Sequence, residues 1–118
     1  MNIKQIIQVV CEEYGLESWE IQRRTRKRYI REPRQVIHYF ANKLTKMSLY
    51  GIGEEAGKLT HATVLNSIKV VQNYIDTDKE FSVNMDRLRD CIKNYYLRLK
   101  NMNTYQDRKE YYLKSINS

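Results

Sequence analysis

Apolar residues recur at helical spacing along most of the chain, beginning at the N-terminus. Asn2 precedes the first such stretch and is a favourable helix N-cap, while Gly15 follows it and suits a helix C-terminus. The residues that share one face of this expected helix are Ile3, Ile6, Ile7, Val10 and Tyr14. We therefore predict a helix over residues 3–14, followed by a short helix that Ser18 caps.

A basic run without apolar periodicity follows at residues 23–35, and we expect a loop there. Helical spacing returns from about Arg31. Pro33 fits that helix only in its first turn, where its missing N–H has no partner to lose. The apolar positions of this second long helix are Val36, Ile37, Phe40, Ala41 and Leu44. The helix is therefore expected to begin near the end of the basic run.

The middle of the chain has the outline of a helix-turn-helix unit. Ser48 caps a short segment that stops at Gly57, and Thr60 caps a longer helix. The apolar face of the longer helix consists of Val64, Leu65, Ile68, Val71 and Ile75. Two helices joined by a tight glycine-containing turn are typical of this motif, although any packed helical hairpin has the same outline. Four glycines and one proline are few for the many turns that an all-β fold needs, so the predicted fold class is all-α.

The C-terminal part of the chain predicts further helices after a polar break at residues 76–79. Ser82 caps the first of them, and residues 101–103 break it before a last amphipathic turn or two. Its apolar positions are Met85, Leu88, Ile92, Tyr95, Tyr96 and Leu99, and those after the break are Tyr105, Tyr112, Leu113 and Ile116. These helices either close the core over the first helix or form a docking surface for a partner or a second copy. We therefore divide the chain into a domain at 1–76 and a helical extension at 77–118.

The charge of the chain is concentrated in one segment. The formal net charge is +7, and residues 23–35 contain seven basic side chains and one acidic side chain. The remaining residues are nearly balanced in charge. A focused basic cluster makes a local field suited to a polyanion, although a solvated loop or a localisation signal has the same composition.

Composition argues against several other classes of protein. No stretch approaches the length of a membrane span, and the N-terminus is not a secretory signal. Cys11 and Cys91 are expected to be reduced in a cytoplasmic core, and two histidines without metal-ligand spacing make a structural zinc site improbable. The sequence contains neither a catalytic constellation nor a phosphate-binding GxxxxGK[ST] loop. We expect a non-enzyme without cofactor or metal.

Residues 3 to about 75 resemble the C-terminal DNA-binding domain of the bacterial replication initiator DnaA, whose helix-turn-helix fold is related to the Trp repressor. The segments that carry the resemblance are Arg26-Lys27-Arg28, Arg34-Gln35, Leu44-Thr45, Ser48-Leu49, Ile52-Gly53 and His61-Ala62-Thr63-Val64-Leu65. The last of these matches the family's signature, typically Asp-His-Ser/Thr-Thr-Val-Leu, at the start of the recognition helix.

The resemblance implies which residues contact double-stranded DNA. Arg26 would enter the minor groove from the basic loop, where a narrow AT-rich groove attracts a guanidinium. His61 and Thr63 would face base edges in the major groove. The positions that match phosphate-contacting or flanking sites of the family are Arg24, Lys27, Arg28, Arg34, Gln35, Ser48, Leu49, Tyr50, Lys58, Thr60 and Ala62. Two of these roles stay open, because His61 could be a capping or partly buried side chain and Tyr50 could be a packing residue.

This sequence departs from the family signature at two positions. Thr60 stands where the family usually has Asp, and Ala62 where it has Ser or Thr. The resemblance therefore implies sequence-specific binding to a DnaA-box-like site, in origin binding or regulation of replication initiation. A protein–protein adaptor in replication, acting through the Tyr-rich C-terminal helices, and a transcriptional regulator are the alternatives. The resemblance also implies that the initiator carries an ATPase domain before its DNA-binding domain. Met1 and the C-terminal extension favour a small protein that has the DNA-binding domain without the ATPase domain, rather than a fragment of an initiator.

Overall fold

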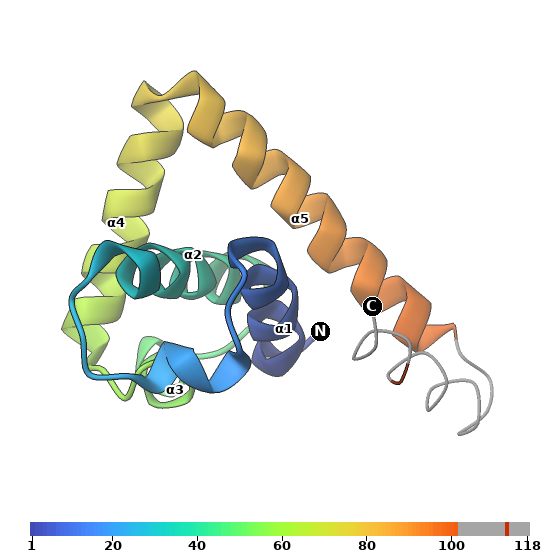
Figure 1. Ribbon diagram of the computed structural model, residues 1–118, viewed down its shortest axis with the longest axis horizontal. Helices are drawn as coiled ribbons and strands as arrows, with labels where there is room; N and C mark the ends of the chain where they lie inside the picture. Colours follow the sequence, from blue (N-terminus) through green and yellow to red (C-terminus); the bar gives the residue numbers. More distant parts are fainter. Residues whose placement is uncertain (102–112, 114–118) are drawn as a thin grey trace.

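The computed structural model describes residues 1–101 and residue 113, and its elements are all helical (Figure 1). In chain order they are α1 (Ile3–Tyr14), the 3₁₀ helix η1 (Ser18–Gln22), α2 (Arg28–Leu44), α3 (Leu49–Glu55), α4 (His61–Thr77) and α5 (Lys79–Lys100). The described residues contain no strand, so the predicted all-α class is confirmed. No helix in this part of the chain is long and apolar enough to cross a membrane.

The helices pack around one core, with α2 between α1 and α4. α3 and α4 pack against each other as the two helices of the helix-turn-helix unit, and α2 supports both of them. The largest side chains that are fully buried are isoleucines: Ile6, Ile21, Ile30, Ile37, Ile52 and Ile92. The helix-turn-helix unit is therefore mounted on a hydrophobic scaffold that α1 and α5 help to build.

The predicted caps of three helices are present. The Asn2 side chain accepts from the Gln5 N–H at 3.1 Å, and Gly15 ends α1 in the left-handed conformation at φ 70°. Ser48 accepts from the Gly51 N–H at 3.0 Å, and the Thr60 hydroxyl accepts from the Thr63 N–H at 3.3 Å. Short polar side chains at these positions satisfy backbone donors that the first helical turn leaves unpaired.

The predicted start of the second long helix was wrong by about three residues. α2 begins at Arg28, so Pro33 lies inside the helix rather than in its first turn. The reason is that Ile30 extends the apolar stripe towards the N-terminus: it is fully buried, three residues before Pro33 and seven before Ile37. Burial of Ile30 and of the Pro33 ring offsets the hydrogen bond that proline cannot donate to the Tyr29 carbonyl.

Two other predicted caps were also wrong. Ser18 is the first residue of η1 rather than its N-cap; the N-cap is Glu17, whose N–H donates to the Glu20 carboxylate at 2.8 Å. α5 begins at Lys79 because Asp78 accepts from the Phe81 N–H at 3.1 Å, which places Ser82 inside the helix. Aspartate is as good an N-cap as serine, and here it comes first along the chain.

α5 turns back from the end of α4 and reaches α1 (Figure 1). Met85, Leu88 and Ile92 bury its inner face, and Arg87 donates to the Glu13 carboxylate of α1 at 2.9 Å. Residues 79–100 therefore help to close the core over the first helix. The expected turns around Tyr105, Tyr112 and Ile116 lie outside the described residues.

Candidate nucleic-acid interface

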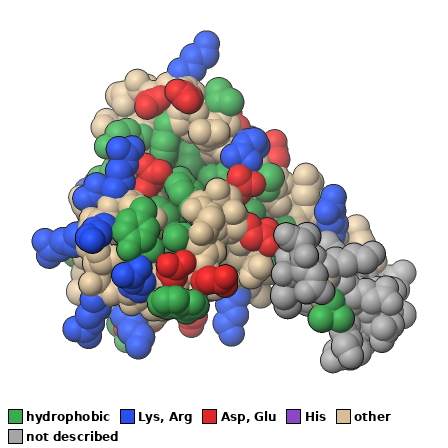
Figure 2. Space-filling view, viewed as in Figure 1, with side chains coloured by type: hydrophobic (Ala, Val, Ile, Leu, Met, Phe, Trp, Pro, Cys, Tyr) green, Lys and Arg blue, Asp and Glu red, His purple; other side chains and the backbone are tan. Residues whose placement is uncertain are grey.

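The basic loop, defined here as residues 23–27, joins η1 to α2 and forms one edge of the molecule (Figure 1). Arg24, Arg26 and Lys27 are exposed on it. Among the residues that the structure describes, none of these three side chains has an ion-pair or hydrogen-bond partner. Lysine and arginine side chains gather along the same edge in the space-filling view (Figure 2). The loop therefore presents uncompensated positive charge to solvent.

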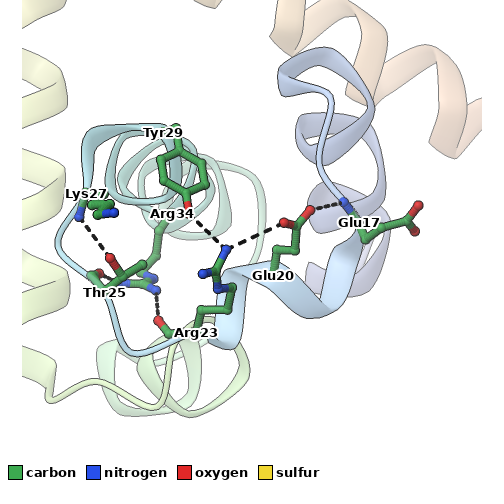
Figure 3. A network of polar contacts seen from close by, with 7 residues as sticks. All are labelled: Glu17, Glu20, Arg23, Thr25, Lys27, Tyr29 and Arg34. Atoms are coloured by element: carbon green, nitrogen blue, oxygen red, sulfur yellow. Dashed lines mark hydrogen bonds and ion pairs between the residues drawn. The ribbon is translucent and has the colours of Figure 1, made fainter.

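Arg23 anchors the beginning of this loop. Its guanidinium donates to the Tyr29 hydroxyl at 2.9 Å, stands 5.9 Å from the centre of that ring, and lies 3.9 Å from a Glu20 carboxylate oxygen (Figure 3). Further along, the Lys27 N–H donates to the Thr25 hydroxyl at 3.2 Å. Local contacts thus fix both ends of the loop while its remaining cations stay free.

Arg34 is the one buried residue of the expected DNA-contacting set, with 8% of its surface exposed. Its guanidinium donates to three backbone carbonyls: Nε to Ile21 at 3.0 Å, one terminal nitrogen to Thr25 at 3.4 Å, and the other to Arg23 at 2.5 Å. Figure 3 shows the side chain reaching from α2 into the curve of the loop. Burial lowers the pKa of this guanidinium from its ordinary value. The arrangement makes Arg34 the internal support of the basic loop.

Two further expected residues lie on α2, beyond the loop. Arg28 is exposed in the first turn and pairs with Glu32 at 3.3 Å. Gln35 is half-buried about two turns further along. Both therefore lie on a helix, so the loop predicted over residues 23–35 is wrong for residues 28–35.

The expected residues of the helix-turn-helix unit lie at the N-terminal ends of its two helices. Leu49 is half-buried on α3, whereas Tyr50 is exposed at 67%, so Tyr50 is not a packing residue. On α4, His61 and Thr63 are exposed and form its first turn with Ala62, which is exposed as well. Thr60 is the cap, so His61 is neither buried nor the capping side chain.

Two glycines make the turn between α3 and α4 possible. A Cβ on Gly53 would overlap the Leu59 carbonyl oxygen, and the Leu59 N–H donates to the Gly53 carbonyl at 3.0 Å. Gly57 has φ 107°, a conformation that side chains rarely adopt, and its Cβ would stand 2.9 Å from the Arg34 side chain. Lys58 follows with φ 52° and is exposed. The turn therefore brings Lys58 out to the surface close to the support of the basic loop.

The basic loop and this turn face each other across a cleft of about 490 Å³. Its walls carry four of the expected residues, Arg24, Arg26, Arg34 and Lys58, which come from segments more than twenty residues apart in sequence. The other ten expected residues do not line this cleft. The fold thus brings the basic loop to the turn that carries Lys58 and leaves the α4 N-terminus as a separate exposed element.

Sequence reasoning assigned no role to His38, which supports α4 from behind. Its Nε2 lies 2.8 Å from the Ala56 carbonyl and so donates to it, and its Nδ1 lies 2.9 Å from the Ser67 hydroxyl. Burial is the main cause that lowers the pKa of this ring, so the neutral form is favoured. His38 therefore ties α2 to the turn and to α4 through uncharged hydrogen bonds.

Gln22, at the end of η1, is a second residue that the sequence did not single out. Its amide donates to the Glu55 carbonyl at 2.7 Å and accepts from the Gly57 N–H at 3.0 Å. Both partners are more than thirty residues away in sequence, so no local pattern could have indicated the contact.

Comparison with known proteins finds a match over most of the helical bundle. Residues 3–71 match the family described as "Bacterial dnaA protein helix-turn-helix". The chromosomal replication initiator protein DnaA of Wolbachia pipientis wMel is 37% identical over 93 residues, covering 79% of this chain and 20% of the relative. The protein of the same name from Flavobacterium psychrophilum is 40% identical over 86 residues, covering 73% and 18%. The chain spans about a fifth of the length of the curated relatives it matches.

Proposed function

Since the chain belongs to the bacterial DnaA helix-turn-helix family, which implies DNA binding in replication initiation, we propose that it reads double-stranded DNA with two surface elements. The basic loop enters the minor groove, with Arg26 inserted. The first turn of α4 lies in the major groove, where His61 and Thr63 face base edges. The site it reads is DnaA-box-like.

The observation that carries this proposal is the set of free cations on an anchored loop. Arg24, Arg26 and Lys27 are exposed and unpaired in the described part of the chain, while the backbone beneath them is held by Arg34. Cations that have no partner within the protein are available for phosphates, and a fixed loop binds with a smaller loss of conformational freedom.

The exposed first turn of α4 supports the second half of the proposal. His61, Ala62 and Thr63 are all accessible, whereas Val64 next to them is fully buried. An imidazole N–H donates to base acceptors, and a threonine methyl group contacts thymine. Ser48, Leu49 and Tyr50 would lie against the DNA backbone beside this turn. Thr60 and Ala62 would adjust the preference away from the standard DnaA box.

We propose that the chain acts in the cytoplasm at replication origins or in regulating initiation, by occupying or marking a site. Its relatives are about four times as long as this chain, so their other activities are not transferred to this part. Replication proteins or a second copy are its expected protein partners.

The proposal is tested by titrating a labelled duplex with the chain at several salt concentrations between about 50 and 200 mM. Arg24→Ala and Lys27→Ala should each flatten the slope of log K against log[salt] by roughly 0.9, because each removes one phosphate contact. The matched control is Lys93→Ala on α5, an exposed lysine on another helix, which should leave the slope unchanged. A protein–protein adaptor would show no salt-dependent binding at all, and that result would refute the proposal.

A further inference from the structure

Gln22 is one of two side chains that connect the basic loop to the helix-turn-helix turn. Gln22 immediately precedes the loop, and its amide group makes one bond to Glu55 and one to Gly57. The donor and acceptor of the amide are both used, and both partners are backbone groups at the end of α3 and in the turn that follows. Gln22 therefore fixes the distance between the last residue of η1 and the turn.

Arg34 makes the corresponding connection from the other side of the loop. It holds the carbonyls of Ile21, Arg23 and Thr25, while its Cδ lies 2.9 Å from the place where a Gly57 Cβ would be. The buried guanidinium thus contacts the loop backbone directly and packs on the turn. Only a planar guanidinium has enough donors, in a fixed fork, to serve three carbonyls together.

We infer that Gln22 and Arg34 are positioning residues that lock the basic loop to the helix-turn-helix turn, so that the two reading elements meet DNA as one rigid unit. The inference rests on the proposed function and gives a structural reason why the chain would bind one DNA sequence in preference to others. In this arrangement Arg34 acts through the loop it supports, whereas the family resemblance alone would make it a phosphate contact.

The physical reason is that two reading elements discriminate best when their relative position is fixed before binding. If the lock is released, the loop must be ordered again when it enters its groove, and each residue so ordered weakens specific binding by about tenfold. Non-specific binding needs no fixed register, because any phosphate can serve a free cation. Releasing the lock should therefore lower specific binding and spare non-specific binding.

Gln22→Ala is the cleanest test, because it removes both bonds without changing the charge. The probes are a duplex selected by the wild-type chain from a random pool and a scrambled duplex of the same composition. Gln22→Ala should lower affinity for the selected duplex by about five- to tenfold, with binding to the scrambled duplex and the salt slope unchanged. The matched control is Gln8→Ala on α1, whose amide donates to Glu12 far from the loop and which should change neither affinity.

Arg34→Lys separates the positioning role from a phosphate contact. Lysine keeps the charge but cannot donate to three carbonyls in a fixed fork. A positioning role predicts that the preference for the selected duplex falls in Arg34→Lys, as it does in Gln22→Ala, while circular dichroism shows that the variant is folded. A phosphate contact predicts that both affinities are nearly retained, and this result would overturn the role of Arg34.

A measurement without DNA checks the lock itself. Hydrogen exchange at the Gly57 N–H should be faster in Gln22→Ala than in the wild type, because that N–H loses its acceptor. If the wild type discriminates between the duplexes and Gln22→Ala discriminates equally well, the inference is wrong and the proposed function stands. If the wild type itself does not discriminate, the proposed function fails and the inference fails with it.

Discussion

Gly53→Ala and Gly51→Ala make the same change two residues apart on α3, and the structure predicts opposite results. A Cβ on Gly53 would overlap the Leu59 carbonyl oxygen, and it would stand 3.1 Å from the Leu59 carbonyl carbon and 3.3 Å from a Val64 methyl group. The obstacle is mostly backbone, so α3 and the turn must separate and the Leu59–Gly53 hydrogen bond weakens. Overpacking and the weakened bond should together lower the free energy of unfolding by about 2–3 kcal/mol.

At Gly51 the same methyl group meets flexible side-chain ends instead. Its nearest neighbours would be the Ser48 hydroxyl at 3.3 Å and the Met47 methyl at 3.5 Å. Alanine is favoured over glycine within a helix by about 0.5–1 kcal/mol, so Gly51→Ala should be neutral or slightly stabilising. Urea denaturation followed by circular dichroism measures both variants. Equal stability losses in the two variants would refute the packing of α3 against the turn.

Three further predictions concern binding and pH. Arg26→Ala should weaken binding to an AT-rich duplex more than to a GC-rich one, and equal losses would exclude insertion of Arg26 into the minor groove. Thr60→Asp combined with Ala62→Thr should move the ratio of affinities towards the standard DnaA box at one salt concentration, whereas an unchanged ratio in a folded variant would place these residues outside the major groove. Burial holds the pKa of His38 below its unfolded value, so the unfolded chain takes up the extra proton and stability should fall as the pH drops below about 6.5. The urea midpoint should fall between pH 7.5 and 5 less steeply in His38→Gln than in the wild type; equally steep declines would show that His38 is not the group responsible.

Local signals were sufficient to predict the helices whose caps and apolar stripes agree. Asn2 caps the start of α1 and Gly15 caps its end, while Ser48 and Thr60 cap the two helices of the helix-turn-helix unit. The start of α2 was missed because Tyr29 and Ile30 stand between basic residues on both sides. The burial of Ile30 depends on contacts with the rest of the fold, which periodicity within a short window does not contain.

The candidate interface was predictable as a set of residue types but not as an arrangement. The charge cluster and the segment at residues 61–65 indicated the two elements that we propose contact DNA. Nothing in the spacing indicated that Arg34 would turn inward, because its three acceptors are backbone carbonyls that converge only when the loop curves around it. The two hydrogen bonds of Gln22 could not be predicted either, because its partners Glu55 and Gly57 are distant in sequence and meet it only in the folded chain.

The most direct test of the central claim is the ratio of two dissociation constants for the wild-type chain at one salt concentration. One is measured on a duplex selected by the chain from a random pool, and the other on a scrambled duplex of the same length and composition. Reading by both the loop and α4 predicts that the selected duplex binds at least about a thousandfold more tightly. A ratio close to one, or a selection that recovers no common sequence, would contradict the claim that this chain reads DNA sequence.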